Sequence, residues 1–211
     1  LRREVEKRVG HYVDDISGHF DRRVYRFATQ AVPLGLSAVF NTTDVAQGLR
    51  QFRHLGDRIE MQGSLGNLRR LGRLGTLIFV PTHSSNLDSI VMGWAFDHAG
   101  LPPCVYGAGK NLFSNPIVGF FMRNLGAYRV DRRLNHVLYK EVLKCYSQVL
   151  IERGYHSLFF PGGTRSRSGR VESKLKLGLL GSALQAFSER QLRGDRRPIF
   201  LVPVTINYPL V

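Results

Sequence analysis

From about residue 75 onward, short apolar runs alternate with longer segments that have the spacing of amphipathic helices. The apolar runs cover 77–80, 104–106, 127–130, 156–160 and 199–206, and the longer segments cover about 86–99, 135–153 and 174–191. Strands that are separated by helices pair in parallel, because each helix returns the chain to the starting edge of the sheet. The alternation therefore predicts an α/β domain with a mostly parallel central sheet flanked by helices.

The first 70 residues lack this alternation and are expected to form an N-terminal helical extension (1–70) to the α/β domain (71–211). Residues 1 to about 30 carry apolar side chains at three- and four-residue steps, and a second helix is predicted over 44–60. The first of these helices either lies on an acidic bilayer or packs on the domain, and its interspersed acidic residues favour packing. The polar segment 63–75 is expected to form a turn and a short helix.

The ends of the chain indicate a piece of a longer protein. The sequence begins with Leu1 rather than Met and stops at Val211, directly after a strand-like segment, so we expect the domain to be truncated at its C-terminus. A membrane-spanning helix needs about 20 apolar residues, and the longest candidate, Ala31 to Phe40, is too short and contains Pro33. Membrane contact within this chain is therefore expected to be peripheral, and a span outside it stays open.

The charge of the chain favours an anionic partner. The net charge is +14, from 30 Lys and Arg against 16 Asp and Glu. Such an excess is typical of proteins that bind nucleic acid, an acidic membrane surface, or a phosphorylated or CoA-like substrate. No nucleic acid is expected, because no helix-turn-helix, RRM or zinc-finger pattern is present. Cys104 and Cys145 lie far apart without a CxxC, so we expect no metal site and a reduced, cytosolic setting.

Residues 82–88 read Thr-His-Ser-Ser-Asn-Leu-Asp and lie between an apolar run and a helical segment. His83 and Asp88 would be about 140° apart on an ideal helix and would not share a face. If His83 lies in the loop before the helix, it can fold back onto Asp88 and form a base with its orienting carboxylate. The alternative is structural, because Ser85 and Asp88 also fit a helix capping box.

A second polar cluster follows the strand predicted over 156–160. Residues 161–170 read Pro-Gly-Gly-Thr-Arg-Ser-Arg-Ser-Gly-Arg. The adjacent glycines let backbone N–H groups approach a ligand, and the hydroxyl and guanidinium groups add donors, which together predict an anion-binding loop. The segment matches neither GxxxxGK[ST] nor GxGxxG. An exposed basic loop or an arginine-rich nucleic-acid contact are the alternative interpretations.

Two further cations are candidates for phosphate binding. Lys110 follows Gly107-Ala108-Gly109, which we interpret as a glycine-rich turn, and it either reaches a phosphate or is a surface lysine. Arg123 stands alone among apolar residues, and burying it is costly unless a protein carboxylate or a substrate phosphate pairs with it.

These blocks resemble the four motifs of the glycerophospholipid acyltransferase family, in the family's order over roughly residues 75–211. The correspondence involves His83 with Asp88 in the first motif, Gly119 to Arg123 in the second, Phe160 to Ser166 in the third, and Leu201 to Val204 in the fourth. One departure is Gly162, which stands where the family usually has glutamate. The doubled glycine and the following Arg-Ser-Arg-Ser-Gly look closer to the glycerol-3-phosphate branch than to the lysophosphatidic acid branch.

The resemblance implies transfer of a fatty acyl group from acyl-CoA or acyl-carrier protein to a hydroxyl of glycerol 3-phosphate, in phospholipid synthesis at the cytoplasmic face of a membrane. It implies that His83 deprotonates the acceptor and that Asp88 orients His83. The residues that match the family's phosphate-binding motifs are Arg123, Gly163, Thr164, Arg165, Ser166 and Arg167. No cofactor or metal is expected, because the thioester is a co-substrate.

Three alternatives remain at this point. The acceptor is lysophosphatidic acid or another lysophospholipid; or the chain is an inactive family member, since Gly162 removes an expected carboxylate; or the chain is a basic nucleic-acid-binding module.

Overall fold

The computed structural model describes residues 2–29, 59–85, 88–162, 175 and 177–208. Five strands form one sheet in the order β3-β2-β4-β1-β5, and every pair of neighbours is parallel. The strands are β1 (Thr76–Pro81), β2 (Val105–Gly109), β3 (Ala127–Val130), β4 (Ser157–Leu158) and β5 (Ile199–Val204). The predicted parallel α/β sheet is thus confirmed.

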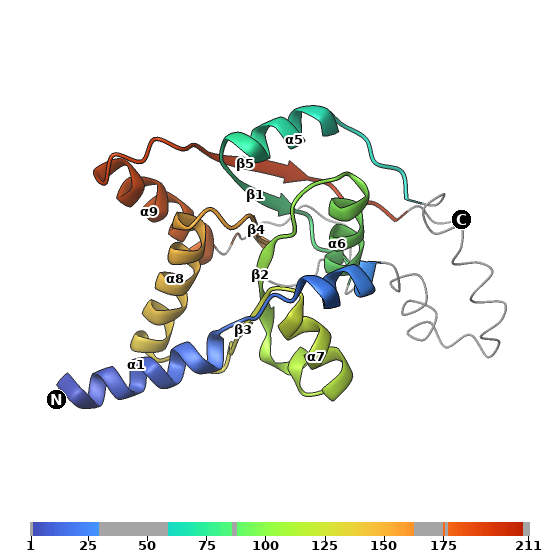
Figure 1. Cartoon of the computed structure of the whole chain (residues 1–211). Coiled ribbons are helices and arrows are strands. Elements are labelled where there is room, and N and C mark those ends of the chain that lie inside the picture. The colour runs from blue at the N-terminus through green and yellow to red at the C-terminus, as the bar shows by residue number, and fades with distance from the viewer. Residues whose placement is uncertain (1, 30–58, 86–87, 163–174, 176, 209–211) are drawn as a thin grey trace.

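Helices cover both faces of this sheet (Figure 1). They are α1 (Arg2–Ile16), α5 (Leu65–Leu74), α6 (Asp88–His98), α7 (Pro116–Asn124), α8 (Val137–Glu152) and α9 (Gly178–Leu192), with a 3₁₀ helix η1 (Lys110–Phe113). Residues 22–29 are also helical. No helix within the described ranges is long and apolar enough to cross a membrane.

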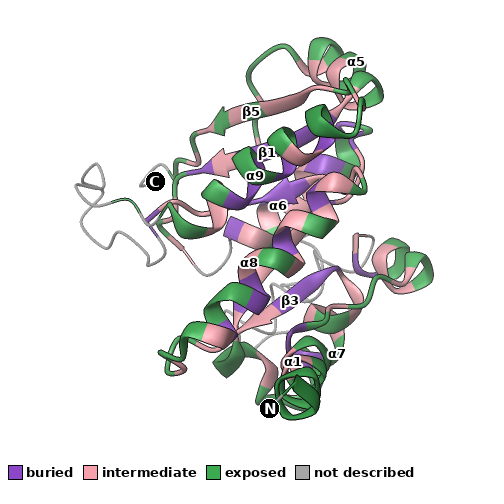
Figure 2. Cartoon of the chain, turned by 90° about the vertical axis from the view of Figure 1, so that its left-hand side faces the viewer, coloured by how far each residue is buried: buried purple, intermediate pink, exposed green. Residues whose placement is uncertain are grey.

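The alternation of side chains along β1 explains the layers. Leu77 and Phe79 pack with Met92 and Phe96 of α6, and apolar residues of α5 lie against the same cluster. Ile78, which points to the other face, packs with residues of α8 and α9. Figure 2 shows the buried residues gathered on the strands and on the helix faces turned toward them. Strand β1 is therefore buried on both faces, as expected for an inner strand of a parallel sheet.

The first helix packs on the domain. Ile16 of α1 is fully buried and contacts a cluster that includes Tyr128 of β3 and Tyr139 of α8. The packed interpretation of the N-terminal segment is confirmed for α1. The helix predicted over 44–60 lies outside the described residues except at its last two positions, and the division of the chain at residue 70 stays a prediction.

One sequence interpretation is wrong. Gly107-Ala108-Gly109 is not a turn but the second half of β2, where it pairs with Tyr128, Arg129 and Val130 of β3. A Cβ added at Gly107 would lie 3.0 Å from side-chain atoms of Tyr128 and Val130. The glycine there leaves room for the side chains of Tyr128 and Val130 rather than permitting a change of direction.

The register of β1 with β5 places the two chain segments that follow these strands side by side. Pro81 is opposite Val204, and the pairing extends beyond the strands because the Thr82 N–H donates to the Val204 carbonyl at 3.0 Å. The Ile206 N–H in turn donates to the Thr82 hydroxyl at 3.0 Å. Residues just after 81 and just after 204 therefore meet at the carboxyl end of the sheet.

Candidate active site

His83 lies in the turn between β1 and α6, and Asp88 is the first residue of that helix. The His83 Nδ1 atom is 2.8 Å from the Asp88 Oδ2 atom. The imidazole therefore folds back from the loop onto the helix, as the sequence interpretation required. The Asp88 side chain is fully buried, whereas that of His83 is 20% exposed. A buried carboxylate with a partly exposed histidine is the arrangement of an oriented base.

Four donors surround the Asp88 carboxylate. Besides His83, the backbone N–H groups of Ser84 and Ser85 donate to Oδ2 at 2.8 and 2.9 Å. The Tyr208 hydroxyl donates to Oδ1 at 2.7 Å. Burial by itself would raise the pKa of Asp88, but these hydrogen bonds outweigh burial and hold the pKa below its usual value. Asp88 is therefore ionised at neutral pH.

The two interpretations of this turn are combined in the structure. The Asp88 carboxylate accepts a hydrogen bond from the Ser85 N–H. This bond is one of the two hydrogen bonds of a capping box. The same carboxylate holds the imidazole. Since an ionised carboxylate only accepts hydrogen bonds, the neutral tautomer of His83 that keeps this contact carries its proton on Nδ1 and has its lone pair on Nε2.

His83 lines a cavity of about 560 Å³ at the carboxyl ends of β2, β3 and β4. The Phe160 ring, which follows β4, lies against the imidazole with ring centroids 4.2 Å apart. Most of the wall is apolar and includes Tyr106, Leu112, Met122, Val130, Leu134, Leu143, Leu158, Phe159 and Leu179. The cavity thus contains a base beside a volume that accommodates an apolar chain. It lies at the sheet edge where α/β proteins bind ligands.

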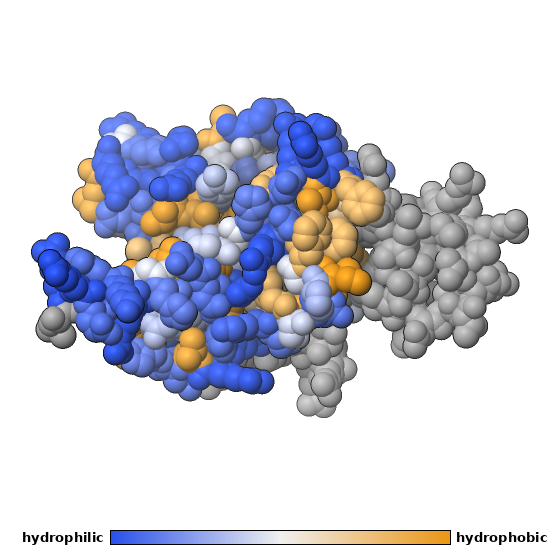
Figure 3. Space-filling model, turned by 60° about the horizontal axis from the view of Figure 1, so that its bottom comes forward, coloured by the Kyte–Doolittle hydropathy of each residue, from blue (hydrophilic) through white to orange (hydrophobic). Residues whose placement is uncertain are grey.

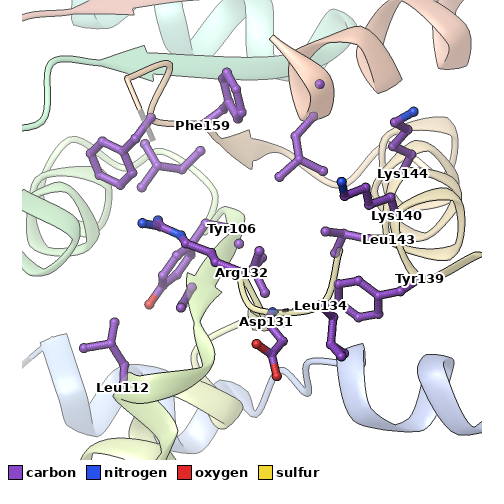
Figure 4. A pocket seen from close by; sticks show the side chains of 18 of the residues that line it. Tyr106, Leu112, Asp131, Arg132, Leu134, Tyr139, Lys140, Leu143, Lys144 and Phe159 are labelled. Atoms are coloured by element: carbon purple, nitrogen blue, oxygen red, sulfur yellow. Dashed lines mark hydrogen bonds between the residues drawn. The ribbon is translucent and has the colours of Figure 1, made fainter. Parts of the chain in front are cut away.

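Three cations also line this cavity. Lys140 and Lys144 stand on one side of α8, and Arg132 follows β3 and extends across the middle of the cavity (Figure 4). Lys144 is paired with Glu141 at 2.7 Å. The site therefore combines a base, an apolar wall and positive charge, which suits a substrate with both a hydrocarbon part and an anionic group.

The other predicted site residues have different positions. Lys110 is 3.1 Å from the Asp15 carboxylate and 3.4 Å from that of Asp131, and the hydrogen bond to Asp15 raises the pKa of Lys110. Arg123 is exposed on α7, so the cost of burying its charge does not arise. Gly163, Thr164, Arg165, Ser166 and Arg167 lie outside the described residues. Only His83 and Asp88 of the predicted set are joined by a contact that the structure describes.

Sequence reasoning missed Tyr208 and the cations of the cavity wall. Tyr208 and Asp88 are 120 residues apart in the chain, so only the pairing of β1 with β5 brings them together. Lys140 and Lys144 are four residues apart on a predicted helix, and this spacing is the signal that could have placed them on one face. The described residues contain no cluster of His, Cys, Asp or Glu that could hold a metal ion.

Comparisons with known proteins identify the family of the chain. A family model described as acyltransferase matches residues 64–207, about two thirds of the chain, and includes the His83–Asp88 pair. A glycerol-3-phosphate acyltransferase of Aeromonas hydrophila subsp. hydrophila is 30% identical over 208 residues, which are 97% of this chain and 23% of that protein. The protein of the same name from Pseudoalteromonas atlantica is 28% identical over 206 residues, again 97% of this chain and 23% of the relative. The chain thus spans about a quarter of the length of these curated relatives.

Among solved structures, the 1-acyl-sn-glycerophosphate (LPA) acyltransferase PlsC of Thermotoga maritima aligns with 86% of this chain and 78% of its own, with 15% identity and a TM-score of 0.40. The family model, by contrast, covers every strand and the oriented histidine, and the named relatives match nearly the whole chain. This chain is therefore a member of the glycerophospholipid acyltransferase family.

Proposed function

We propose that the protein transfers a fatty acyl group from a thioester, acyl-CoA or acyl-carrier protein, to a hydroxyl of glycerol 3-phosphate. The observation that carries the proposal is the His83–Asp88 pair, bonded at 2.8 Å beside an apolar cavity of about 560 Å³. An acyl chain needs such a wall, and a hydroxyl needs such a base to react at neutral pH. No protein nucleophile is required, because the acceptor itself attacks.

In this mechanism, Nε2 of His83 removes the proton of the acceptor hydroxyl while the oxygen forms a bond to the thioester carbonyl carbon. Asp88 stabilises the imidazolium that results. The tetrahedral intermediate then collapses, the C–S bond breaks, and the imidazolium returns the proton to the departing thiolate. The products are the ester and the free thiol, so His83 ends in its starting protonation state.

The choice of glycerol 3-phosphate as acceptor follows the names of the two curated relatives. Its phosphate would be held by the residues that match the family's motifs, namely Arg123, Gly163, Thr164, Arg165, Ser166 and Arg167. Binding the phosphate fixes the hydroxyl near His83 and removes the entropy cost of that encounter from the chemical step.

Arg132, Lys140 and Lys144 are assigned to a phosphate of one of the two substrates, because they line the cavity that contains His83. Replacing both lysines with glutamine should raise the KM of that substrate about tenfold and change kcat little. Steady-state kinetics with each substrate varied separately would identify the substrate. The control is Arg133→Gln, an exposed neighbour that does not line the cavity. Unchanged KM values for both substrates in the double variant would contradict the assignment.

The test of the proposed function is acyl transfer by the purified protein, with glycerol 3-phosphate and 1-acylglycerol 3-phosphate offered separately. His83→Ala should lower kcat by about 10²–10⁴-fold and leave the fold intact by circular dichroism. His11→Ala, an exposed histidine on α1, is the matched control. Transfer at the wild-type rate in His83→Ala would refute the mechanism, and a preference for the acylated acceptor would replace glycerol 3-phosphate with lysophosphatidic acid.

A peripheral membrane location, at the cytoplasmic face, belongs to the same proposal. The support is an exposed apolar patch that consists of Phe27, Ile117, Val118 and Phe120, with exposed fractions of 60%, 71%, 42% and 53%. The rings of Phe27 and Phe121 stack with centroids 6.3 Å apart, so the helix over 22–29 and α7 are neighbours. In Figure 3 most of the visible face is hydrophilic, and hydrophobic side chains gather in separate areas of it.

A further inference from the structure

A second cavity, of about 190 Å³, lies at the amino end of β1, where the sheet is farthest from His83. Its lining residues are Gly72, Arg73, Leu74, Gly75, Thr76, Arg153, Gly154, His156, Arg190 and Arg197. Four of these ten residues are arginines, contributed by α5, by the C-terminal end of α8, by α9 and by the turn before β5. Elements that are distant in the sequence thus bring four arginines to one small volume.

Arg190 is the buried member of the group. Its side chain is 3% exposed; Nε donates to the Asp195 carboxylate at 3.0 Å and Nη1 donates to the Thr76 hydroxyl at 3.2 Å. The Nη2 atom is buried and has no hydrogen-bond partner in the described part of the chain. A buried charged donor without an acceptor is costly, and an oxygen of a ligand in the cavity would remove that cost.

The charge around the cavity is not balanced by protein carboxylates. Asp195 contacts both Arg190 and Arg197, at 3.0 and 2.7 Å. Arg73 and Arg153 are exposed and form no ion pair with any residue that the structure describes. Two of the four arginines therefore have no carboxylate partner among the described residues, and the mutual repulsion of the four charges favours binding of an anion.

His156 adds a neutral donor to the cavity wall. Its Nδ1 atom accepts a hydrogen bond from the Leu77 N–H at 2.9 Å, and burial lowers the pKa of His156. The neutral tautomer that keeps this bond carries its proton on Nε2. The wall thus offers N–H donors of two kinds, and forked guanidinium donors match the oxygens of a phosphate.

We propose that this cavity is a binding site for a phosphate group, separate from the candidate active site. Thr76 begins β1 and His83 follows its end, so the two sites are roughly 23 Å apart at the rise of a strand. A phosphate bound here cannot belong to a glycerol 3-phosphate that reacts at His83. It belongs either to a soluble phosphorylated compound or to the head group of a phospholipid.

The test is thermal unfolding of the protein in inorganic phosphate, with ionic strength held constant by sodium chloride. At ten times its Kd, phosphate should raise Tm by about 3–6 °C in the wild-type protein. The variant Arg73→Gln with Arg153→Gln should lose most of this rise, because it removes two cavity donors that are exposed and make no ion pair within the described residues. Arg190→Met should lose it as well, although this variant also breaks the contacts with Asp195 and Thr76.

The control is Arg70→Gln with Arg196→Gln, which removes the same charge from two exposed arginines outside the cavity. This variant should keep the wild-type response, and so should Arg123→Gln, which affects only the proposed acceptor site. An equal response of the cavity variant and the control variant, or no rise in the wild-type protein, would refute the proposal.

Vesicle sedimentation distinguishes the two sources of the phosphate. If the ligand is a lipid head group, vesicles that contain phosphatidic acid should bind the wild-type protein more tightly than the Arg73→Gln, Arg153→Gln variant, and free phosphate should compete. If the ligand is soluble, both proteins should bind these vesicles as tightly as the control variant does. Both results are compatible with the site, and the unfolding experiment alone decides whether it exists.

Discussion

Asp88 shows how a single buried side chain supports both local structure and the proposed chemistry. Its carboxylate accepts two backbone N–H groups that fix the turn after β1, and it also holds the imidazole of His83. Since the carboxylate is fully buried, each donor it loses leaves part of its charge unsolvated. The turn and the proposed base therefore depend on the same four hydrogen bonds.

Among the described residues, Tyr208 is the one whose hydroxyl donates a hydrogen bond to the Asp88 carboxylate. The substitution Tyr208→Phe removes this bond. The lost bond is to a charged group, so we expect the free energy of unfolding at pH 7 to fall by about 1.5–3 kcal/mol. The pKa of Asp88 in the folded protein lies below its ordinary 3.8. The stability that comes from holding the ionised form is therefore present above pH 3.8 and is lost as the pH falls through the folded-state pKa.

Urea unfolding of the wild-type protein and Tyr208→Phe at pH 7 and pH 3 measures this effect. The difference between the two proteins should be larger at pH 7. The control is Tyr155→Phe, because Tyr155 is 52% exposed. This substitution should change the free energy of unfolding little at either pH. A difference of equal size at both pH values would show that Tyr208 acts by packing and not on the ionised carboxylate.

At the scale of helices and strands, local patterns predicted the type of many elements, although not of η1 or α7, and they did not predict which elements are neighbours. The apolar run 127–130 is β3, and the segment 135–153 contains α8, because burial on a strand and on a helix leaves different spacings in the sequence. The contact between Tyr208 and Asp88 depends on β5 lying beside β1, which no local spacing records. Gly107 was misinterpreted because, in a sequence, a glycine that leaves room for side chains of the neighbouring strand cannot be told from one that permits a turn.

The glycine of the second motif has a packing role in the structure. Gly119 lies in α7, which begins after Asn115, whose side chain accepts the N–H groups of Ile117 and Val118. A Cβ added at Gly119 would lie 2.8 Å from the Phe113 carbonyl oxygen. That oxygen belongs to the backbone of η1, so it cannot move away as a flexible side chain would. Gly119 therefore sets how closely α7 approaches η1.

We expect Gly119→Ala to lower the free energy of unfolding by about 1–3 kcal/mol, because the methyl group must displace backbone. Gly93→Ala is the matched control, since Gly93 is also helical and a Cβ there would meet no atom within 4 Å. That substitution should instead raise stability by about 0.5–1 kcal/mol, through the lower entropy of the unfolded chain. Urea unfolding of both variants tests the pair, and destabilisation of equal size would contradict the packing role of Gly119.

At the scale of the whole molecule, the positive charge is found at both ends of the sheet. Arg132, Lys140 and Lys144 line the cavity at the carboxyl ends, whereas a second group of arginines lines the cavity at the amino end of β1. The net charge of +14 indicated an anionic partner but could not say how many anion sites exist or where they lie. Charge is a property of composition, whereas a site requires that side chains from several elements converge.

The proposed membrane contact depends on both the exposed apolar patch and the excess of positive charge. Substitutions in the patch test whether the apolar part contributes to binding. Ile117→Asp with Phe120→Asp removes two of the exposed apolar side chains and adds two negative charges. Burying such side chains contributes about 1.5–3 kcal/mol each, so vesicle affinity should fall by about 100-fold or more. Sedimentation with vesicles of phosphatidylglycerol and phosphatidylcholine measures the affinity.

Leu184→Asp with Leu192→Asp is the control, because it adds the same charge at two leucines of α9 that are 72% and 78% exposed and lie outside the patch. If the patch is inserted into the bilayer, the control variant should lose only the electrostatic part of binding, and raising the salt concentration should bring it close to the wild-type protein. The patch variant should stay weak at every salt concentration, since its loss is mainly apolar. Equal losses in the two variants would mean that net charge alone brings the protein to the membrane and that α7 does not enter it.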